Sequence, residues 1–422
     1  MELRFLPVTE ASTSPGHPDP GLIDEAVRIV SAGATNLISE ADLRKKLARG
    51  QPLRVKLGID PTASDIHLGF AVVLRKLRQF QDLGHTAVLI LGDFTAQVGD
   101  PTGRSATRPR LAAEQIEANL VTYQAQAGLI LRPDRLEVHR NSEWLGALGA
   151  DGLLRLAGSA TVAQMLERDD FSKRYAAGQP ISVMELLYPL LQGWDSVMVR
   201  ADVELGGSDQ LFNNLVGREL QAREGQEPQV VLTTPLLEGL DGVHKMSKSL
   251  GNYIGITEPA AEQFGKVMSI PDSLLPRYML LATGWHPDRV EAETAALASR
   301  ELHPNVAKRL LARTIVDLYH GDGAGAGGEA AFDQVFKKHD VPEFELRPEH
   351  LVDGRIRVAR LLALAGLAKS NSEGARKITE GAVRLNGERI TTPDLELAPD
   401  QLGDGLLQVG RRAWARIRWL SG

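Results

Sequence analysis

Two segments of the chain carry residue types that suit the binding of a polyphosphate. The first, residues 60–70 (DPTASDIHLGF), places Thr62 and His67 where an apolar stretch ends and an amphipathic stretch begins. A helix that starts there offers free N–H groups and a positive dipole end, to which both side chains add hydrogen-bond donors. Gly69 lacks a side chain, so a flat ring can lie against the backbone. The segment predicts a nucleotide site, although a lone histidine at a helix start is more often structural.

The second segment, residues 244–249 (HKMSKS), holds two lysines three positions apart and is flanked by glycines at 239, 242 and 251. A mobile loop of this kind can place Lys245 and Lys248 against the charge that develops on a departing pyrophosphate. The alternative is a solvated basic loop with no ligand.

Strand and helix signals alternate around the first segment. Leu53–Ile59 and Thr86–Leu91 are short and apolar, and His67–Leu83 between them is amphipathic, which is typical of a parallel βαβ unit. Residues 21–50 read as helical, and the alternation continues to about residue 235. Ligands bind at the carboxyl ends of parallel strands. The predicted fold class is therefore α/β, with a Rossmann-type parallel-sheet catalytic domain.

The rest of the chain changes character. Residues 258–320 show helical periodicity, residues 321–328 (GDGAGAGG) are predicted to be a flexible segment, and residues 329–350 resemble a linker region. The glycines at 323, 325 and 328 match GxGxxG, but the stretch before them is helical, so a dinucleotide site is rejected. The predicted organisation is a flexible N-terminus (1–20), the catalytic domain (21–257), an α-helical domain (258–335), a linker (336–350) and a small α+β domain (351–422).

Composition limits the remaining possibilities. The formal net charge of the 422 residues is −6, which excludes a uniformly basic nucleic-acid coat. Residues 351–422 nevertheless contain 12 Lys and Arg against 8 Asp and Glu, so the charge of this part is +4. Cysteine is absent, which excludes thiolate metal sites and cysteine nucleophiles. No apolar stretch reaches the roughly 20 residues that span a bilayer, and a cytoplasmic protein without a membrane partner is expected.

HxGx after DPT, followed some 180 residues later by KMSKS, resembles the paired signatures of class I aminoacyl-tRNA synthetases. The KMSKS match is complete. The first signature departs from the usual HIGH at its last position, where Phe70 replaces histidine and leaves one adenine or ribose contact open.

Further segments resemble the bacterial tyrosyl-tRNA synthetases. Tyr188, Gln192 and Asp195 follow spacings of four and three, which places them on one helix face. In that family the first two hold the amino group of tyrosine and the aspartate takes the phenol hydroxyl. The resemblance further implies catalytic roles for Thr62, His67, Lys245, Lys248, Arg104 and Arg108. It implies tyrosine binding by Lys56, Asp60, Thr95, Asp100, Tyr188, Gln192, Asp195 and Gln210. It implies ATP binding by Gly58, His67, Gly69, Gly207, Asp209, Gln210 and Lys248.

Lys56 is a charged residue in a strand that is otherwise apolar, at a position where many family members carry tyrosine. We hypothesise that it pairs with Asp195 or another pocket acid and keeps that acid ionised. The alternative is that Lys56 reaches solvent from the strand end.

The C-terminal region resembles the small RNA-binding module first described in a small-subunit ribosomal protein, the S-four-like domain. Two short helices starting near Arg355 and Ser372, with Ser370 or Ser372 as a cap, precede a turn at residues 386–387. Residues 411–419 (RRAWARIRW) are expected to form an edge strand with a basic face, and the alternative is that Trp414 and Trp419 pack the core of the module. The expected RNA-binding residues are Lys369, Arg376, Lys377, Arg384 and Arg389.

The resemblance implies a tyrosine–tRNA ligase that forms tyrosyl-adenylate from L-tyrosine and ATP and transfers the tyrosyl group to tRNA-Tyr. It also implies Mg²⁺ arriving with ATP, no protein metal site, an anticodon-binding role for residues 258–335, and a homodimer. Two alternatives stay open. One is a tryptophanyl-tRNA synthetase, which shares the fold and both signatures, and the other is a non-catalytic RNA-binding relative.

Overall fold

The computed structural model describes residues 18–61, 65–102, 112–337, 343–386, 388–402, 405–410 and 413–419. The chain forms two compact units, residues 1–329 and 330–422. The predicted boundary at residue 257 thus falls inside the first unit. Of the predicted N-terminal segment 1–20 only the last three residues are described, and there Asp19 caps the first helix, which begins at Pro20.

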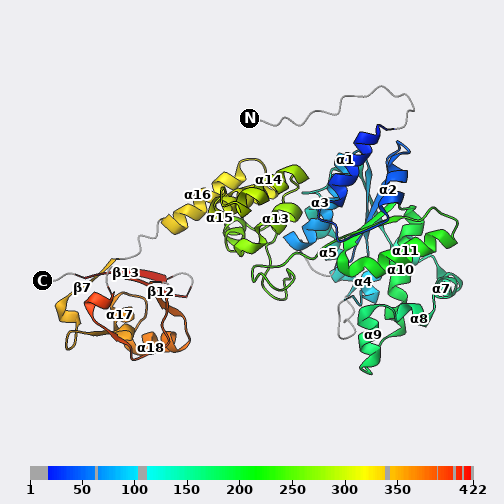
Figure 1. Cartoon of the computed structure of the whole chain (residues 1–422). Coiled ribbons are helices and arrows are strands. Elements are labelled where there is room, and N and C mark those ends of the chain that lie inside the picture. Colours follow the sequence, from blue (N-terminus) through cyan, green and yellow to red (C-terminus); the bar gives the residue numbers. More distant parts are fainter. Residues whose placement is uncertain are drawn as a thin grey trace. The chain divides into compact units, whose positions relative to one another are not determined.

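A six-stranded sheet lies at the centre of the first unit, with the order β1-β6-β5-β2-β3-β4 (Figure 1). All neighbouring pairs are parallel except β1 with β6, which are antiparallel. The mixed α/β fold with a parallel-strand sheet is therefore confirmed. The strands are β1 (Asn36–Ile38), β2 (Arg54–Ile59), β3 (Thr86–Leu91), β4 (Leu136–Arg140), β5 (Val203–Gly207) and β6 (Val230–Thr234).

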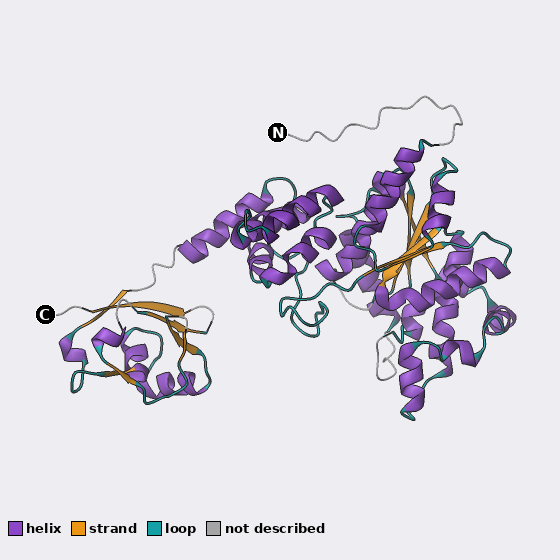
Figure 2. Ribbon diagram, in the orientation of Figure 1, coloured by secondary structure: helices purple, strands orange, loops and turns teal. Residues whose placement is uncertain are grey.

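Helices surround this sheet (Figure 2). The helices that precede or connect the strands are α1 (Pro20–Ser31), α2 (Glu40–Leu47), α3 (Leu68–Asp82), α4 (Thr95–Val98), α5 (Ala113–Ala127), α6 (Ser142–Leu145), α7 (Gly149–Ala157), α8 (Val162–Met165), α9 (Asp169–Ala176), α10 (Val183–Val199) and α11 (Leu211–Arg223). Of these, α7, α8 and α9 lie away from the sheet (Figure 1). After the sheet come α12 (Ala260–Met268), α13 (Leu275–Ala282), α14 (Pro287–Ala298), α15 (Pro304–His320) and α16 (Ala324–Lys337).

The first βαβ unit matches its sequence signals closely. β2 and β3 pair in parallel along their whole length, and their side chains are almost all buried, as two-faced burial of a parallel sheet requires. α3 connects them, packs its apolar face on the sheet and begins directly after His67. The prediction of one helix over residues 21–50 was wrong in its middle, because residues 36–38 form β1 at the sheet edge.

The prediction of a flexible segment at residues 321–328 was also wrong. α16 begins at Ala324, and a Cβ on Gly325 would lie 2.4 Å from the carbonyl oxygen of Arg313 in α15. Glycine is needed there because two helix backbones approach closely, and such packing stabilises a helix despite a composition that favours flexibility.

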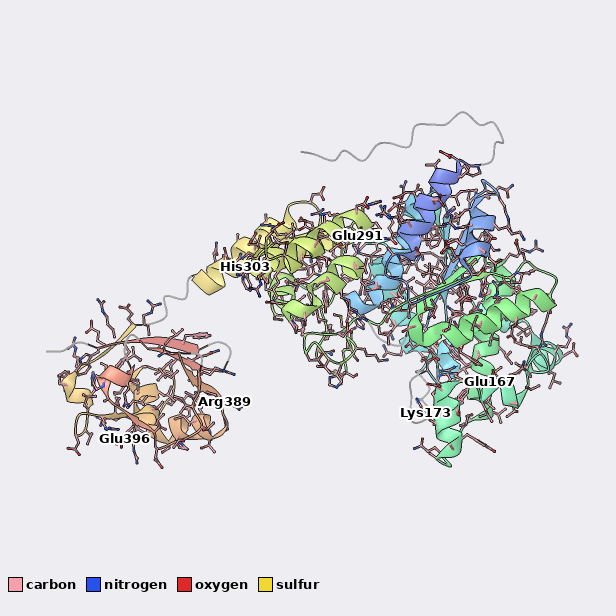
Figure 3. The ribbon with its side chains drawn as sticks, in the orientation of Figure 1. Glu167, Lys173, Glu291, His303, Arg389 and Glu396 are labelled. Carbon is pink, nitrogen blue, oxygen red and sulfur yellow. The ribbon has the colours of Figure 1, made fainter. Side chains whose placement is uncertain are left out.

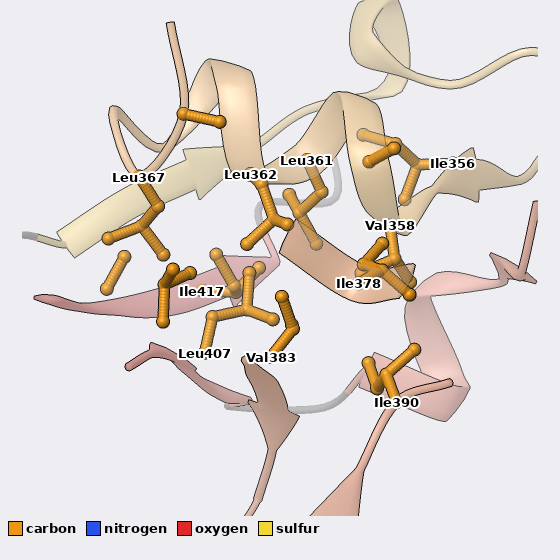
Figure 4. Close-up of a cluster of buried hydrophobic side chains, with 14 of the residues drawn as sticks. Ile356, Val358, Leu361, Leu362, Leu367, Ile378, Val383, Ile390, Leu407 and Ile417 are labelled. Atoms are coloured by element: carbon orange, nitrogen blue, oxygen red, sulfur yellow. The ribbon is translucent and has the colours of Figure 1, made fainter. Parts of the chain in front are cut away.

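The second unit combines a five-stranded sheet, ordered β10-β9-β12-β13-β7, with short helices. Leu361, Leu362 and Ile378 from two helices pack on Leu407 and Ile417 of the sheet (Figure 4). Its elements are β7 (Glu343–Leu346), β8 (Ile356–Arg357), α17 (Val358–Leu364), α18 (Asn371–Thr379), β9 (Val383–Leu385), β10 (Glu388–Arg389), β11 (Glu396–Leu397), α19 (Pro399–Leu402), β12 (Leu406–Val409) and β13 (Ala413–Trp419).

Two predictions for this unit need correction. Residues 343–346 of the predicted linker 336–350 form β7, which pairs in parallel with β13. β13 therefore lies between β7 and β12 rather than at an edge. Its side chains still alternate as expected, with Ala415 and Ile417 buried and Arg416 and Arg418 exposed.

Candidate active site

A cavity of about 410 Å³ opens at the carboxyl ends of β2, β3 and β5. The strand order reverses between β2 and β5, and an open α/β sheet leaves a crevice at such a point because the connections run to opposite sides. Its predicted lining residues are Gly58, Asp60, His67, Gly69, Thr95, Asp100, Tyr188, Gln192, Asp195, Gly207, Asp209, Gln210 and Lys245. Three other predicted residues, Thr62, Arg104 and Arg108, lie outside the described residues.

Asp60 lies at the floor of the cavity, directly after β2. Its two carboxylate oxygens accept hydrogen bonds from Thr95 Oγ1 at 2.7 Å and from the Tyr188 hydroxyl at 2.9 Å. Burial raises the pKa of Asp60 to about 7, against these two hydrogen bonds, and the nearby Asp100 and Asp195 raise it further. Gly92 makes this contact geometry possible, because a Cβ there would lie 2.1 Å from the Asp60 carboxylate. A cation bound here would offset the cost of keeping the Asp60 carboxylate ionised.

Asp195 is the second acid of the cavity, and its side chain is buried. Two residues that the sequence did not indicate donate hydrogen bonds to it. Trp144 Nε1 donates to Oδ1 at 2.8 Å and Asn141 Nδ2 donates to Oδ2 at 3.2 Å. Burial raises the pKa of Asp195 to about 6, while the charge of Lys56 and these two donors lower it. At neutral pH the group is mostly an anion that can accept a hydroxyl proton from a ligand.

Lys56 is fully buried, so the alternative in which it reaches solvent was wrong. Its Nζ donates to Glu204 Oε1 at 2.8 Å, to Ser196 Oγ at 2.8 Å and to the carbonyl oxygen of Gln192 at 2.9 Å. The ion pair thus forms with Glu204 and not with Asp195. Lys56 and Glu204 are also register partners on β2 and β5, so opposite charges in two apolar strands were the signal that could have paired them.

A chain of hydrogen bonds joins the third acid, Asp100, to Gln192 on α10. Gln210 Nε2 donates to Asp100 Oδ2 at 2.8 Å, and Asn213 Nδ2 donates to both Gln210 and Gln192 at 3.0 Å. Arg168, which sequence reasoning missed, is almost fully buried and donates to Asn213 at 3.0 Å. These bonds hold the polar side chains of three separate elements in one arrangement.

His67 lies at the opposite end of the cavity and caps α3. Its Nδ1 accepts a hydrogen bond from the N–H of Phe70 at 3.3 Å, so the ring proton of the neutral form resides on Nε2. Burial, with the charge of Lys248, lowers the pKa of His67 to about 4. The side chain is therefore a neutral donor at pH 7. Phe70 packs edge-on against Tyr123, at 6.1 Å between ring centroids.

The two sequence signatures meet at this end. The N–H of Leu68 donates to the carbonyl oxygen of Ile254 at 2.8 Å, and the N–H of Gly69 donates to Met246 Sδ at 3.2 Å. Lys245 lines the cavity, whereas Lys248 Nζ contacts Asp65 Oδ2 at 2.9 Å. The loop therefore presents one lysine to the cavity and rests the other on the first signature.

Gly207 ends β5 at the same end, and Asp209 follows it in the next turn. Burial raises the pKa of Asp209, and the charge of Lys245 opposes that rise. A Cβ on Gly207 would lie 2.6 Å from Asp209 Oδ1, so any larger residue at position 207 would clash with this carboxylate. Among the described residues there is no group of three His, Asp or Glu side chains that could hold a metal ion.

The predicted RNA-binding residues of the second unit differ in how much of the side chain is exposed. Lys369, Arg376, Arg384 and Arg389 are exposed, and Arg389 lies on β10 (Figure 3). Lys377 is half-buried, since its Nζ donates to the carbonyl oxygen of Leu367 at 2.9 Å and pairs with Glu373 at 3.2 Å. Ser370 caps α18 by accepting from the N–H of Glu373.

Comparisons with known proteins agree with this geometry. The family model "tRNA synthetases class I (W and Y)" matches residues 48–337, and the model "Tyrosine--tRNA ligase SYY-like C-terminal domain" matches residues 331–413. The chain is 51% identical to a "Tyrosine--tRNA ligase" of Geobacter metallireducens over 402 residues, 94% of this chain and 99% of that protein. It is 51% identical to a "Tyrosine--tRNA ligase" of Coxiella burnetii over 398 residues, 93% of this chain and 98% of that protein.

A solved structure shares the fold. The tyrosyl-tRNA synthetase of Archaeoglobus fulgidus, complexed with L-tyrosine, aligns with a TM-score of 0.60 at 24% identity, over 72% of this chain and 99% of that one.

Proposed function

Because the chain belongs to the bacterial class I tyrosyl-tRNA synthetases, we propose that it activates L-tyrosine with ATP and transfers the tyrosyl group to tRNA-Tyr. The tyrosine carboxylate attacks the α-phosphate of ATP, and pyrophosphate leaves as tyrosyl-adenylate forms. A hydroxyl of the 3′-terminal adenosine then attacks the adenylate carbonyl, and AMP leaves. Mg²⁺ enters as part of the ATP substrate.

The observation that carries the proposal is the group of three acids, Asp60, Asp100 and Asp195, at one end of the cavity. In this proposal Asp60 and Asp100 bind the ammonium of tyrosine, with Thr95, Tyr188, Gln192 and Gln210 around it. Asp195, held by Trp144 and Asn141, accepts a hydrogen bond from the phenol hydroxyl. Phenylalanine would leave that buried acceptor without a partner, and an unmade hydrogen bond of this kind is costly.

The nucleotide end supplies donors and positive charge. His67 Nε2 and Lys245 act on the phosphates, with Lys248 joining them, while Gly58, Gly69, Gly207 and Asp209 surround the nucleoside. Thr62, Arg104 and Arg108 belong to the same proposal through the family motif alone. Positioning and charge stabilisation would supply most of the rate, because the attacking carboxylate needs no general base.

ATP–pyrophosphate exchange tests this proposal, run with each of the twenty amino acids in turn. Exchange that depends on tyrosine alone supports it, and exchange that depends on tryptophan contradicts it. No exchange with any amino acid would support the non-catalytic alternative instead.

The exposed basic residues of the second unit, Lys369, Arg376, Arg384 and Arg389, are proposed to contact the tRNA backbone, with Lys377 supporting α18, the helix that carries Arg376. Residues 258–335 are proposed to approach the anticodon. Such phosphate contacts predict that tRNA affinity falls steeply with salt. Replacing Arg384 and Arg389 together by alanine should weaken tRNA binding and leave exchange unchanged. If tRNA binding by this double variant depended on salt as steeply as binding by the wild type, the proposed contacts would be contradicted.

We also propose a homodimer that works in the cytoplasm, where tRNA is charged. Support for the dimer comes from exposed apolar side chains on four consecutive helices, namely Leu154, Val162, Tyr175 and Val183. Val183→Asp should convert a dimer to a monomer in analytical ultracentrifugation. Among the described residues no helix is long and apolar enough to cross a membrane.

A further inference from the structure

The loop that carries Lys245 and Lys248 is held together by hydrogen bonds to one side chain, that of Asn252. This side chain is 6% exposed and lies between β6 and α12, next to the exposed residues Leu250 and Gly251. Its Oδ1 accepts from the N–H of Ser247 at 2.8 Å. Its Nδ2 donates to the carbonyl oxygens of Lys245 at 3.2 Å and His244 at 3.4 Å, and to Asp241 Oδ2 at 3.1 Å.

The surrounding backbone is built to fit this amide. The carbonyl oxygen of Asn252 accepts from the N–H of Leu240 at 2.9 Å, and a Cβ on Gly239 would lie 2.4 Å from the Asn252 side chain. Asp241 in turn accepts from the N–H groups of Val243 and His244, both at 3.1 Å. The amide thus ties the start, the middle and the end of the loop together.

We propose that Asn252 is a positioning residue for adenylate formation, which rests on the proposed function. It fixes the backbone on both sides of Lys245 while leaving that lysine's side chain in the cavity. A charge that must meet a developing pyrophosphate loses its effect when it is displaced by about 1 Å. Asn252 touches no substrate, and its contribution appears in the rate of activation rather than in tyrosine affinity.

That the Asn252 amide is uncharged and has an N–H donor matters as much as its position. Asp241 is a carboxylate whose pKa is lowered to about 2, first by the N–H of Val243 and then by His244 and Asn252. Asn252→Asp would keep an acceptor for Ser247 but would remove the Nδ2 donor and place a second carboxylate beside Asp241. Asp241→Asn in that background restores a donor between the two side chains, and its amide oxygen still accepts from residues 243 and 244.

The experiment compares four full-length enzymes in tyrosine-dependent ATP–pyrophosphate exchange: wild type, Asn252→Asp, the double variant Asn252→Asp with Asp241→Asn, and Leu250→Ala. Leu250 is exposed in the same loop and contacts none of these groups by a hydrogen bond, so it serves as the control. Asn252→Asp should lower kcat by roughly tenfold or more, with the tyrosine KM within about twofold. The double variant should recover part of the loss, because the contact between residues 241 and 252 returns while the carbonyl oxygens of His244 and Lys245 still lack their donor, and Leu250→Ala should match wild type.

A second readout does not use activity. Limited trypsin digestion should cleave after Lys245 and Lys248 faster in Asn252→Asp than in wild type, and the double variant should be protected again. An unchanged kcat, a joint loss of tyrosine affinity, or a double variant no better than Asn252→Asp would overturn the proposal. Wild-type exchange independently reports on the proposed function, so the two failures can be told apart.

Discussion

Replacing Lys56 by methionine should destabilise the enzyme mainly because it leaves Glu204 buried without its cation. Glu204 is 1% exposed, and besides Lys56 it accepts from Ser196 Oγ at 3.0 Å and from Gln229. Breaking a buried ion pair on one side costs about 3–5 kcal/mol. The retained donors point to the lower part of that range, so we expect the free energy of unfolding at pH 7 to fall by about 3 kcal/mol.

Protonation limits this loss and gives it a pH dependence. The ordinary pKa of a glutamate carboxyl in an unfolded chain is about 4.3, so neutralising one costs roughly 3.7 kcal/mol at pH 7 and roughly 1 kcal/mol at pH 5. The destabilisation of Lys56→Met should therefore shrink between pH 7 and pH 5. Urea denaturation at several pH values measures it, with the change in wild type subtracted.

The double variant Lys56→Met with Glu204→Gln is the matched control. It removes both charges and keeps the shape, so it should be more stable than Lys56→Met alone at pH 7. Tyrosine KM should also rise in Lys56→Met, because the charge of Lys56 lowers the pKa of Asp195 and its Nζ holds the carbonyl oxygen of Gln192. A Lys56→Met enzyme with wild-type stability and tyrosine KM would refute the role given to this ion pair.

Four further outcomes follow from the cavity. Tyrosine kcat/KM should fall as pH decreases through about 7, since the ammonium binds ionised Asp60; Asp60→Asn should abolish that inflection. The same raised pKa means that folding keeps a proton, so Asp60 opposes stability increasingly as pH rises from about 4 to 7, and Asp60→Asn should flatten the pH profile of chemical denaturation. Trp144→Phe should lower kcat/KM for tyrosine by roughly tenfold and leave that for phenylalanine nearly unchanged, which competitive exchange assays measure. His67→Ala should lower kcat of exchange by roughly a hundredfold with little change in tyrosine KM, and near-normal adenylate formation would contradict its role.

The part of the site that could be predicted from sequence is the part written in local patterns. His67 and Gly69 lie within one short segment, and Tyr188, Gln192 and Asp195 follow helical spacing, so their neighbourhood did not require knowledge of the whole fold. The β2–α3–β3 unit was predictable for the same reason, because apolar strands and an amphipathic helix leave a clear periodicity.

The residues that sequence reasoning missed act across elements. Trp144, Asn141 and Arg168 are single side chains without a repeated spacing, and each finds its partner only once distant segments have packed. Glu204 is different: a lone acid in an apolar strand, like Lys56, indicated a buried partner, and only the strand register that pairs them was missing. β7 and α16 were missed because the sheet partner or the neighbouring helix, and not local composition, determines their structure.

The charges at the two ends of the cavity also explain how an amino acid is oriented there. At one end, burial and the charges of Asp100 and Asp195 raise the pKa of Asp60, so an ionised Asp60 is costly there. A ligand that brings an ammonium and a hydroxyl relieves this cost, whereas a carboxylate in the same place would increase it. Lys245 and the neutral donor His67 lie at the other end, where the charge of Lys245 offsets that of Asp209. If tyrosine binds as proposed, we expect its carboxylate to point away from Asp60 and Asp195 and toward Lys245 and His67, which is the orientation that attack on the α-phosphate requires.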